Sequence, residues 1–296
     1  MRIFLKLICL SLLVSLFSCG TRREGAPRSK LDQWMYEEER LRVLSTTAMI
    51  GDLVERVGGD RVRSLILMPG SVDPHSYELV KGDDEKLARA DIVFCNGLGL
   101  EHGASLSYWL AESDHTVAVG EVVARDFPDR LLYIDKAIDP HIWMDASLWC
   151  EVIEPIVERL VSLAPAHEEA FRSRGAALYA EIMQVDQAVF EQMQSVPSSK
   201  RYLVTSHDAF NYFARRYLAD PLEESWSARF QAPEGLAPDG QLGMHDIEQI
   251  LEHIERYQIQ FLFPESNVSL DSLKKIHAVA KARGLEIYFA KTPLFG

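Results

Sequence analysis

Three histidines lie where a protein of alternating strands and helices would hold a ligand. His75 and His141 each follow an Asp-Pro pair, and His207 follows the buried-strand pattern of residues 202–204. In an open α/β sheet, the loops that follow the strands line the ligand crevice. Neutral imidazole is the commonest protein ligand for first-row transition metals. We therefore expect these three side chains to meet around one metal ion.

A single histidine in a loop is more often a solvated or hydrogen-bonding residue than a ligand, so the metal hypothesis depends on the three together. A ligating imidazole needs its second ring nitrogen held by a carboxylate or a carbonyl. The proline before His75 and before His141 fixes one backbone dihedral and suits a preformed loop. Carboxylates nearby in the sequence could hold the rings: Asp73, Asp139, Asp145 and Asp208.

Two further residues are candidates to complete the site. Glu265 follows a predicted strand and is the best placed carboxylate, although an acid there would equally stabilise the N-terminus of the next helix. His102 follows the turn at 96–99 and is a weaker candidate. The other histidines fall on predicted helix faces or strand edges, where we expect structural or solvated roles: His115, His167, His245, His253 and His277.

The elements that must position these residues alternate between strand and helix. In the first half, strands are predicted over 41–47, 62–68, 91–95 and 116–119, and helices over 49–57, 81–90 and 146–163. In the second half, strands are predicted over 201–205, 259–263 and 285–290, and helices over 208–218, 245–257 and 270–283. This alternation predicts an α/β fold with two β-α-β lobes, each built on a parallel sheet.

A long helical pattern separates the two alternating regions. It covers ~30 residues within 165–198, which is ~45 Å at 1.5 Å per residue. We interpret it as a rigid linking helix between an N-terminal lobe of residues 41–164 and a C-terminal lobe of residues 199–296. An α/β lobe usually ends with a helix that covers its sheet, whereas this chain stops in a loop soon after a strand. We therefore expect the C-terminal lobe to continue past Gly296.

The N-terminus has the pattern of a lipoprotein signal peptide. A short basic region precedes an apolar stretch over 8–17, which is too short to span a bilayer as a helix. Cys19 follows a small residue, as in a bacterial lipobox, so residues 1–19 are predicted to direct export and lipidation of Cys19. An ordinary secretory signal and an uncleaved anchor are the alternatives, and all three place the protein in the periplasm or cell envelope. Residues 20–40 predict a flexible tether.

Composition excludes some classes of protein. The net charge of −13 argues against nucleic-acid binding, which needs a basic surface. An acidic surface does not repel a cation, but solubility alone explains the charge. Cys95 and Cys150 remain after the signal; they have no metal-finger spacing and are predicted to be buried free thiols, with a disulfide left open.

Four segments together resemble the metal-specific solute-binding proteins of ABC importers, a family of zinc-, manganese- and iron-binding lipoproteins. They read DPHSYE (73–78), ADIVFCNGLGLE (90–101), DPHIWMD (139–145) and VTSHDAFNYF (204–213). The resemblance runs from about residue 41 to the end and is strongest to chlamydial members. It implies two α/β lobes joined by one long helix, with the ion in the cleft between them. It also implies His75 and His141 as ligands from the first lobe and His207 from the second.

The resemblance leaves the fourth ligand open. In the family it is usually an aspartate in the loop after the last strand. Here that loop is residues 292–296, and no Asp occurs in it. The fourth ligand is therefore either absent from this sequence or replaced by Glu265.

The resemblance implies a monomer that captures a transition-metal ion outside the membrane and delivers it to an importer permease with its ATPase. No bond is made or broken, so the protein is not expected to be an enzyme. Zinc-dedicated members often carry a His-rich loop in the first lobe, and residues 119–138 contain no His. This favours Mn²⁺, Fe²⁺ or Fe³⁺ as the cargo, with Zn²⁺ as the alternative.

Two other functions use the same residues. An envelope metallohydrolase would need an open coordination position and a general base, for which Asp208 or Glu265 could serve. A lipid-anchored adhesin would carry the metal incidentally to cell adhesion. A site closed by protein ligands argues against hydrolysis, and a role in metal uptake argues against the adhesin.

Overall fold

The computed structural model of this chain describes residues 29–134, 136–237 and 242–295. The predicted signal peptide and its Cys19 lie outside these ranges. Within them, no helix is both long enough and apolar enough to cross a membrane. The cysteines Cys95 and Cys150 are buried and free, as predicted.

A short helix, α2 (Lys30–Met35), forms inside the stretch predicted to be a tether. Ser29 caps it by accepting a hydrogen bond from the backbone N–H of Asp32, whose carboxylate in turn accepts from the Ser29 backbone. The predicted flexible tether is therefore helical over part of its length. Helix α2 belongs to a unit that ends at Tyr36, whereas all elements described below belong to the unit of residues 37–296.

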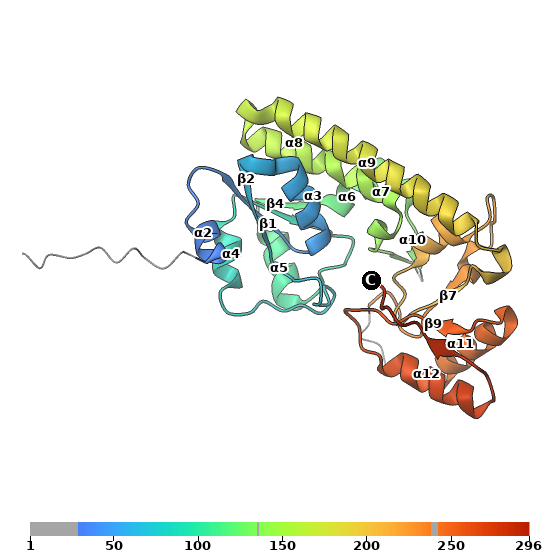
Figure 1. The fold of residues 1–296 in the computed structure, drawn as a ribbon. Coiled ribbons are helices and arrows are strands. Elements are labelled where there is room, and N and C mark those ends of the chain that lie inside the picture. The colour runs from blue at the N-terminus through green and yellow to red at the C-terminus, as the bar shows by residue number, and fades with distance from the viewer. Residues whose placement is uncertain (1–28, 135, 238–241, 296) are drawn as a thin grey trace, which may run out of the picture. The chain divides into compact units, whose positions relative to one another are not determined.

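The first lobe is built on a four-stranded parallel sheet with the order β2-β1-β3-β4 (Figure 1). Its strands are β1 (Leu41–Ser45), β2 (Val62–Ile66), β3 (Ile92–Cys95) and β4 (Thr116–Ala118). Val43 and Leu44 are successive residues of β1 and point to opposite faces, yet both are fully buried. Both faces are therefore covered, as in other parallel sheets.

Four helices connect these strands or follow them: α3 (Ala48–Gly58), α4 (Asp83–Arg89), α5 (Ala104–Glu112) and α6 (Val119–Asp126). The predicted helices over 49–57 and 81–90 correspond to α3 and α4. The sequence does not predict α5, because Leu106 is its one buried residue and the helix lacks an apolar stripe.

The segment after the sheet is more broken than predicted. Strands β5 (Tyr133–Ile134) and β6 (Ala137–Ile138) form an antiparallel pair that leads into the His141 loop. The predicted single helix over 146–163 consists of α7 (Ala146–Trp149), a 3-10 turn over 150–152 and α8 (Ile153–Leu163). Pro155 explains the break, because it has no N–H to donate to residue 151 and is tolerated only in the first turn of a helix.

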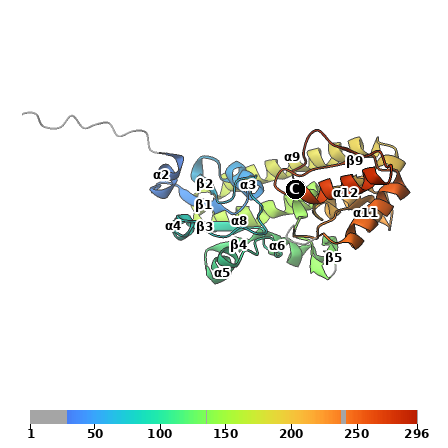
Figure 2. The ribbon, with the colours of Figure 1, turned by 90° about the horizontal axis from the view of Figure 1, so that it is seen from below.

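The long helix α9 (Glu168–Gln194) has 27 residues, which corresponds to about 40 Å. Pro165–His167 precede it as a separate 3-10 turn. Helix α9 contacts α3 and α8 of the first lobe and the π-helical turn η7 (Ala214–Leu218) of the second. Figures 1 and 2 show it running alongside both lobes, as a linking helix should.

The second lobe has shorter strands than predicted. They are β7 (Leu203–Val204), β8 (Phe230–Gln231), β9 (Phe261–Leu262) and β10 (Tyr288–Phe289). β7 pairs with β8 and β9 with β10, all in parallel, and Phe263 N–H donates to Val204 O between β9 and β7. Helices α11 (Met244–Tyr257) and α12 (Asp271–Ala282) supply most of its core. β8 lies outside the predicted strands, and the predicted helix over 208–218 is limited to α10 (Asn211–Phe213) and η7.

The hydrophobic cores do not divide at residue 199. The first core includes the sheet and helices of the first lobe, but also Leu203, Phe210, Tyr212 and Phe230. The second core is confined to the second lobe and centres on α11, α12 and Val204. The segment that carries His207 is therefore packed on the first core by its apolar side chains.

A buried ion pair fastens α9 to the second lobe. Asp186 on α9 is almost fully buried, whereas the Arg216 side chain is 31% exposed. Nε of Arg216 lies 3.0 Å from one oxygen of Asp186, and the hydroxyl of Tyr217 donates to the same oxygen at 2.8 Å. Burial alone would raise the pKa of Asp186, but these hydrogen bonds outweigh it and hold the pKa below its usual range.

Replacement of Arg216 by Met should destabilise the protein. The change keeps the aliphatic stem but leaves Asp186 buried without its cation, and we expect a loss of about 2 kcal/mol, reduced from the fully buried case because Arg216 is partly solvated. Arg56→Met is the matched control. Arg56 pairs with Glu181, which lies on α9 like Asp186, but both side chains of this pair are well exposed. Denaturant unfolding measures both, and equal effects would contradict the proposed role of the buried pair.

Candidate metal centre

The imidazoles of His75, His141 and His207 form one buried cluster. One ring nitrogen from each lies within 4.8 Å of the others, and the Nε2 atoms of His75 and His141 are 3.1 Å apart. Their exposed fractions are 3%, 1% and 1%. Among the described residues no other group of three His, Cys, Asp or Glu side chains could hold a metal. The structure thus brings together the three histidines predicted from the sequence.

The two Asp-Pro-His loops share one local geometry. In each, a carboxylate oxygen of the aspartate accepts a hydrogen bond at 2.9 Å from the backbone N–H of the histidine two residues on: Asp73 from His75, and Asp139 from His141. This side-chain turn, with a proline of fixed φ inside it, gives the loop few other conformations. The sequence pattern therefore produces a preformed histidine position.

Two buried carboxylates contact the second ring nitrogens. Asp139 Oδ1 lies 2.7 Å from Nδ1 of His141, and Glu265 Oε2 lies 2.7 Å from Nδ1 of His207. The contact between Glu265 and His207 is close but is not aligned as a hydrogen bond. In both rings Nε2 is left as the nitrogen available to a metal, and a carboxylate on Nδ1 makes that nitrogen more basic.

Each of these carboxylates is itself held in place. Asp139 Oδ2 accepts a hydrogen bond from the Asn211 side chain at 3.1 Å. Glu265 Oε1 accepts from the backbone N–H groups of Ser206 and His207, at 2.8 and 3.0 Å. Glu265 is therefore placed behind His207, and its carboxylate is not part of the histidine cluster. The geometry favours Glu265 as a support for His207 over its predicted role as a direct ligand.

The other predicted supports behave differently. Asp145 caps α7 by accepting from the Leu148 N–H and also accepts from Ser147 Oγ. Asp208 Oδ1 accepts from the Asn211 side chain. Asp73 holds the backbone N–H of His75. Of the four aspartates considered, Asp139 has an observed contact with an imidazole nitrogen of the cluster.

Burial sets the protonation states of two of the clustered histidines, His75 and His141. Burial, together with the nearness of His141, lowers the pKa of His75 to about 3. Burial also lowers the pKa of His141 well below its usual range. Both rings are therefore neutral near pH 7, which is the form that binds metals. Burial raises the pKa of Asp139 to about 7, against the hydrogen bonds from the His141 N–H and Asn211.

A further buried carboxylate, Glu101, organises the strand ends beneath the site. It accepts hydrogen bonds from Thr46 Oγ1 at 2.7 Å and from the backbone of Asn96 and Gly97 at 2.8 and 3.0 Å. The Asn96 side chain donates to the carbonyl of Pro140 at 3.1 Å. This chain of contacts connects the ends of β1 and β3 to the His141 loop. The sequence does not assign this role to Glu101, nor its supporting role to Asn211, because both depend on partners far away in the chain.

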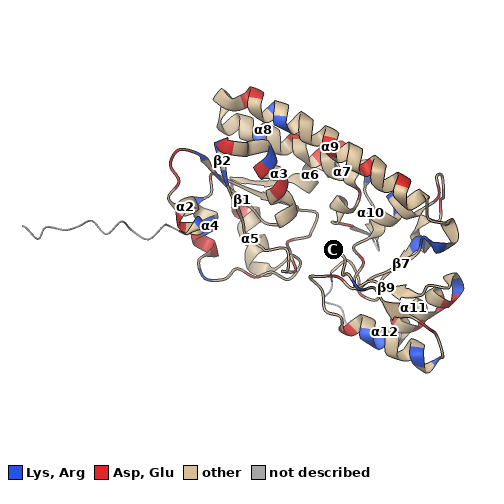
Figure 3. Cartoon of the chain, viewed as in Figure 1, with Lys and Arg blue, Asp and Glu red and all other residues tan. Residues whose placement is uncertain are grey.

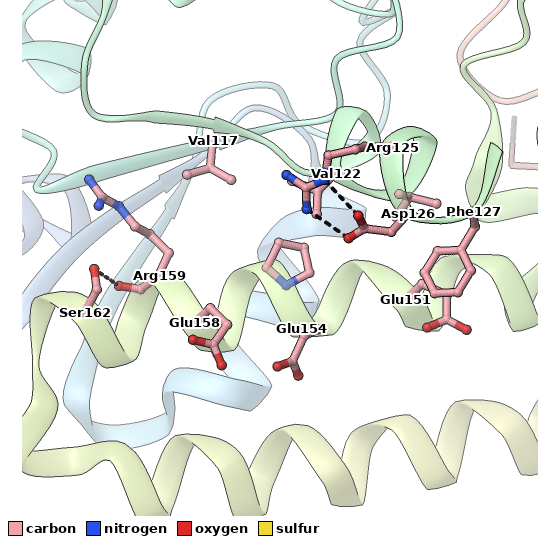
Figure 4. Close-up of a pocket in the computed structure, with 12 residues that line it drawn as sticks. Val117, Val122, Arg125, Asp126, Phe127, Glu151, Glu154, Glu158, Arg159 and Ser162 are labelled. Atoms are coloured by element: carbon pink, nitrogen blue, oxygen red, sulfur yellow. Dashed lines mark hydrogen bonds and ion pairs between the residues drawn. The ribbon is translucent and has the colours of Figure 1, made fainter.

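Two pockets formed by the described residues lie outside the histidine cluster. A pocket of about 530 Å³ lies between α6 and α8 and contains none of the clustered histidines; Figure 4 shows Arg125 paired with Asp126 in its wall. A pocket of about 390 Å³ adjoins the histidine loops at Pro74 and Trp143, and no acid or histidine lines it. The carboxylates of Asp208 and Glu265, the two predicted bases, are already engaged as described above.

Comparison with known proteins shows the family of the chain. Residues 43–293 match the ZnuA family, the periplasmic component A of the zinc-uptake complex. The metal-binding protein YtgA of Chlamydia trachomatis is 36% identical over 98% of this chain and 86% of its own. The manganese-binding lipoprotein MntA of Bacillus subtilis is 29% identical over 91% of this chain and 82% of its own.

Solved structures show the same fold. The crystal structure of Fe(III)-bound YtgA from Chlamydia trachomatis superposes with a TM-score of 0.81 and 37% identity, over 86% of this chain and 89% of that one. The periplasmic zinc-binding protein TroA of Treponema pallidum gives a TM-score of 0.77 and 29% identity, over 87% and 89%. These matches confirm the predicted α/β fold of two lobes with a long linking helix. The chain belongs to the ZnuA family of metal-binding solute-binding proteins.

Proposed function

We propose that this protein captures one transition-metal ion outside the cytoplasmic membrane and delivers it to the permease of an ABC importer. The observation that carries the proposal is the cluster of three buried imidazoles, two of them backed by buried carboxylates. Neutral imidazoles in a pocket of this kind bind a cation without any titration near pH 7. The sequence relatives support the same role, since their names describe metal-binding proteins and lipoproteins.

Manganese or iron is the proposed cargo. Three imidazole donors accept several first-row metals, and the relatives named above bind iron, manganese or zinc. Residues 119–138 lack histidine, so the first lobe has no His-rich loop of the kind that zinc-dedicated members carry. Selection between metals therefore falls to metal availability and to the shape of the site.

The residues of the chain perform binding rather than bond cleavage. His75, His141 and His207 supply the donor atoms, while Asp139 and Glu265 orient two of the rings. We assign Glu265 to this supporting role. Among the described residues, we therefore propose the three histidines as ligands and no carboxylate. The family consists of transport proteins, and neither predicted base is free to act on a substrate. An adhesive role gains no specific support from the site.

The location and the partners follow from the same proposal. Cys19 would carry the lipid anchor, residues 20–40 would separate it from the fold, and a monomer would dock on a permease and its ATPase. Residues 41–164 and 199–296 would act as lobes on either side of the linking helix at 165–198. Acidic and basic side chains are interspersed on α8, α9, α11 and α12 (Figure 3), which fits a soluble exterior better than a nucleic-acid surface.

Alanine at His75, His141 and His207 together should abolish metal binding. Protein purified without added metal and then exposed to Mn²⁺ or Fe²⁺ should hold about one ion per chain, and the triple variant should hold close to none. Metal content by mass spectrometry provides the measurement. The matched control replaces His167, His245 and His277, which lie outside the cluster. If the triple variant keeps its ion, the proposed site is wrong.

Removal of either supporting carboxylate should weaken binding without abolishing it. Asp139→Asn and Glu265→Gln should each lower the metal affinity about 10- to 100-fold, the usual cost of losing a carboxylate behind a ligating histidine. Titration against a chelator of known affinity measures the change. Asp145→Asn is the control, since Asp145 is a buried neighbour that caps α7 instead of contacting a ring. A complete loss of binding in Glu265→Gln would assign Glu265 as a direct ligand.

Equilibrium competition should favour zinc even though we propose another cargo. Imidazole donors bind Zn²⁺ more tightly than Mn²⁺ or Fe²⁺ on intrinsic grounds. Apo protein equilibrated with equal Mn²⁺ and Zn²⁺ should therefore contain mostly zinc, whereas protein isolated from its own cell envelope should contain manganese or iron. Mass spectrometry of both samples provides the check. Zinc in the isolated protein would overturn the proposed cargo.

A further inference from the structure

A fourth imidazole, His102, adjoins the cluster but is not one of its members. Its ring centroid lies 5.5 Å from that of His75. His102 is exposed, whereas the three clustered histidines are buried. The ring of His102 is therefore exposed to water and also lies next to the buried histidines.

The position of His102 beside His75 is fixed by contacts between their two segments. The carboxylate of Glu78 accepts hydrogen bonds from the backbone N–H groups of Ala104 and Ser105, at 2.7 and 2.9 Å. Ser105 Oγ accepts in return from the N–H of Leu79 at 2.8 Å. These bonds hold the segment after His102 against the segment after His75.

Glycine at position 103 allows the two segments to approach so closely. A Cβ atom built on Gly103 would lie 2.0 Å from the carbonyl oxygen of Tyr77, which is backbone and cannot turn aside. The residue directly after His102 thus packs on the backbone two residues after His75. The neighbouring rings are a consequence of this packing.

The ring of His102 is prepared to bind a metal through Nε2. Its Nδ1 lies 3.2 Å from the carbonyl oxygen of Gly99. A carbonyl only accepts hydrogen bonds, so Nδ1 must carry the proton, and the lone pair of the neutral ring then lies on Nε2. A carbonyl on Nδ1 is one of the usual arrangements for a ligating histidine.

We propose that His102 is a transit ligand: its Nε2 takes a metal ion from water, passes it to the buried histidines and receives it again on release. The inference deepens the proposed function and rests on it. Exchange of water ligands for imidazoles one at a time avoids a fully desolvated ion between solvent and the buried site, and such desolvation is costly.

A transit ligand has a distinct kinetic signature. It contacts the ion on the path but not in the final complex, so its loss slows binding and release by the same factor. The dissociation constant, which is the ratio of the two rate constants, then stays unchanged. A permanent ligand would instead alter the dissociation constant.

The test follows Co²⁺ as a probe with apo protein in a stopped-flow instrument. Tryptophan fluorescence reports its arrival, because the Trp143 ring lies 5.2 Å from that of His141 and Co²⁺ quenches fluorescence nearby. Release is measured by mixing loaded protein with excess EDTA. For His102→Ala we expect the rate constants of binding and release to fall about tenfold each, within the range by which variants of one binding site differ in association rate. The variant should still bind one ion, and its dissociation constant should stay within about twofold of that of the unaltered protein.

Two further variants separate metal transit from a role in the turn. His102→Asn keeps a donor for the Gly99 carbonyl but lacks a comparable metal ligand, so it should be as slow as His102→Ala. His102→Asp offers a metal ligand and should recover much of the rate. Both keep a polar side chain, so they decide the question even if His102→Ala folds poorly.

His167→Ala is the control for loss of a histidine elsewhere. His167 lies with Ala164 beside Leu41 and Arg42, at the opposite end of β1 from the metal centre. Its removal should leave both rate constants unchanged. Three results would each overturn the transit role: unaltered rates in His102→Ala, full rates in His102→Asn, or a larger dissociation constant in His102→Ala. Failure of the unaltered protein to bind Co²⁺ would instead count against the proposed function itself.

Discussion

The structure depends on keeping three imidazoles buried within a few ångströms of one another. Desolvation disfavours the charged forms of His75 and His141, and the nearness of the two rings lowers the pKa of His75 further. The Nε2 atoms of His75 and His141 lie at contact distance, an arrangement that two protonated rings would not tolerate. The cluster thus keeps one nitrogen from each ring within 4.8 Å of the others, which a metal ion could bind.

The fold meets this constraint with buried carboxylates at the ends of strands. Asp139 and Glu265 stand behind two of the rings, and each is fixed by donors of its own. Glu101 has no ring to hold, yet it joins the ends of β1 and β3 to the His141 loop through Asn96. These contacts are possible because the carboxyl ends of parallel strands meet at one edge of the sheet.

Local sequence patterns were sufficient where the structure is local, and insufficient elsewhere. The Asp-Pro-His loops could be predicted, since the aspartate, the proline and the histidine interact within three residues. The α3 and α4 helices followed from their apolar spacing. Strand β8 and helix α5 were not predicted, and the other strands of the second lobe are shorter than predicted, because tertiary contacts set their limits. The helix break before α8 was also missed, although Pro155 gives it a local cause. Glu265 was placed near the site, but the sequence does not show on which side of His207 it lies, so its contacts could not be predicted.

The residues that follow His207 pack on the first core, and this packing limits how far the site can open. His75 and His141 belong to the first lobe, while His207 comes from the segment after β7 in the second. Yet Phe210 and Tyr212, just after His207, lie in the first core. The hydroxyl of Tyr212 also donates to the carbonyl of Asp139 and accepts from the N–H of Leu132. A wide separation of His207 from the other two would break these buried contacts, so the three donors form a largely fixed set and metal exchange requires a path to the site more than a hinge.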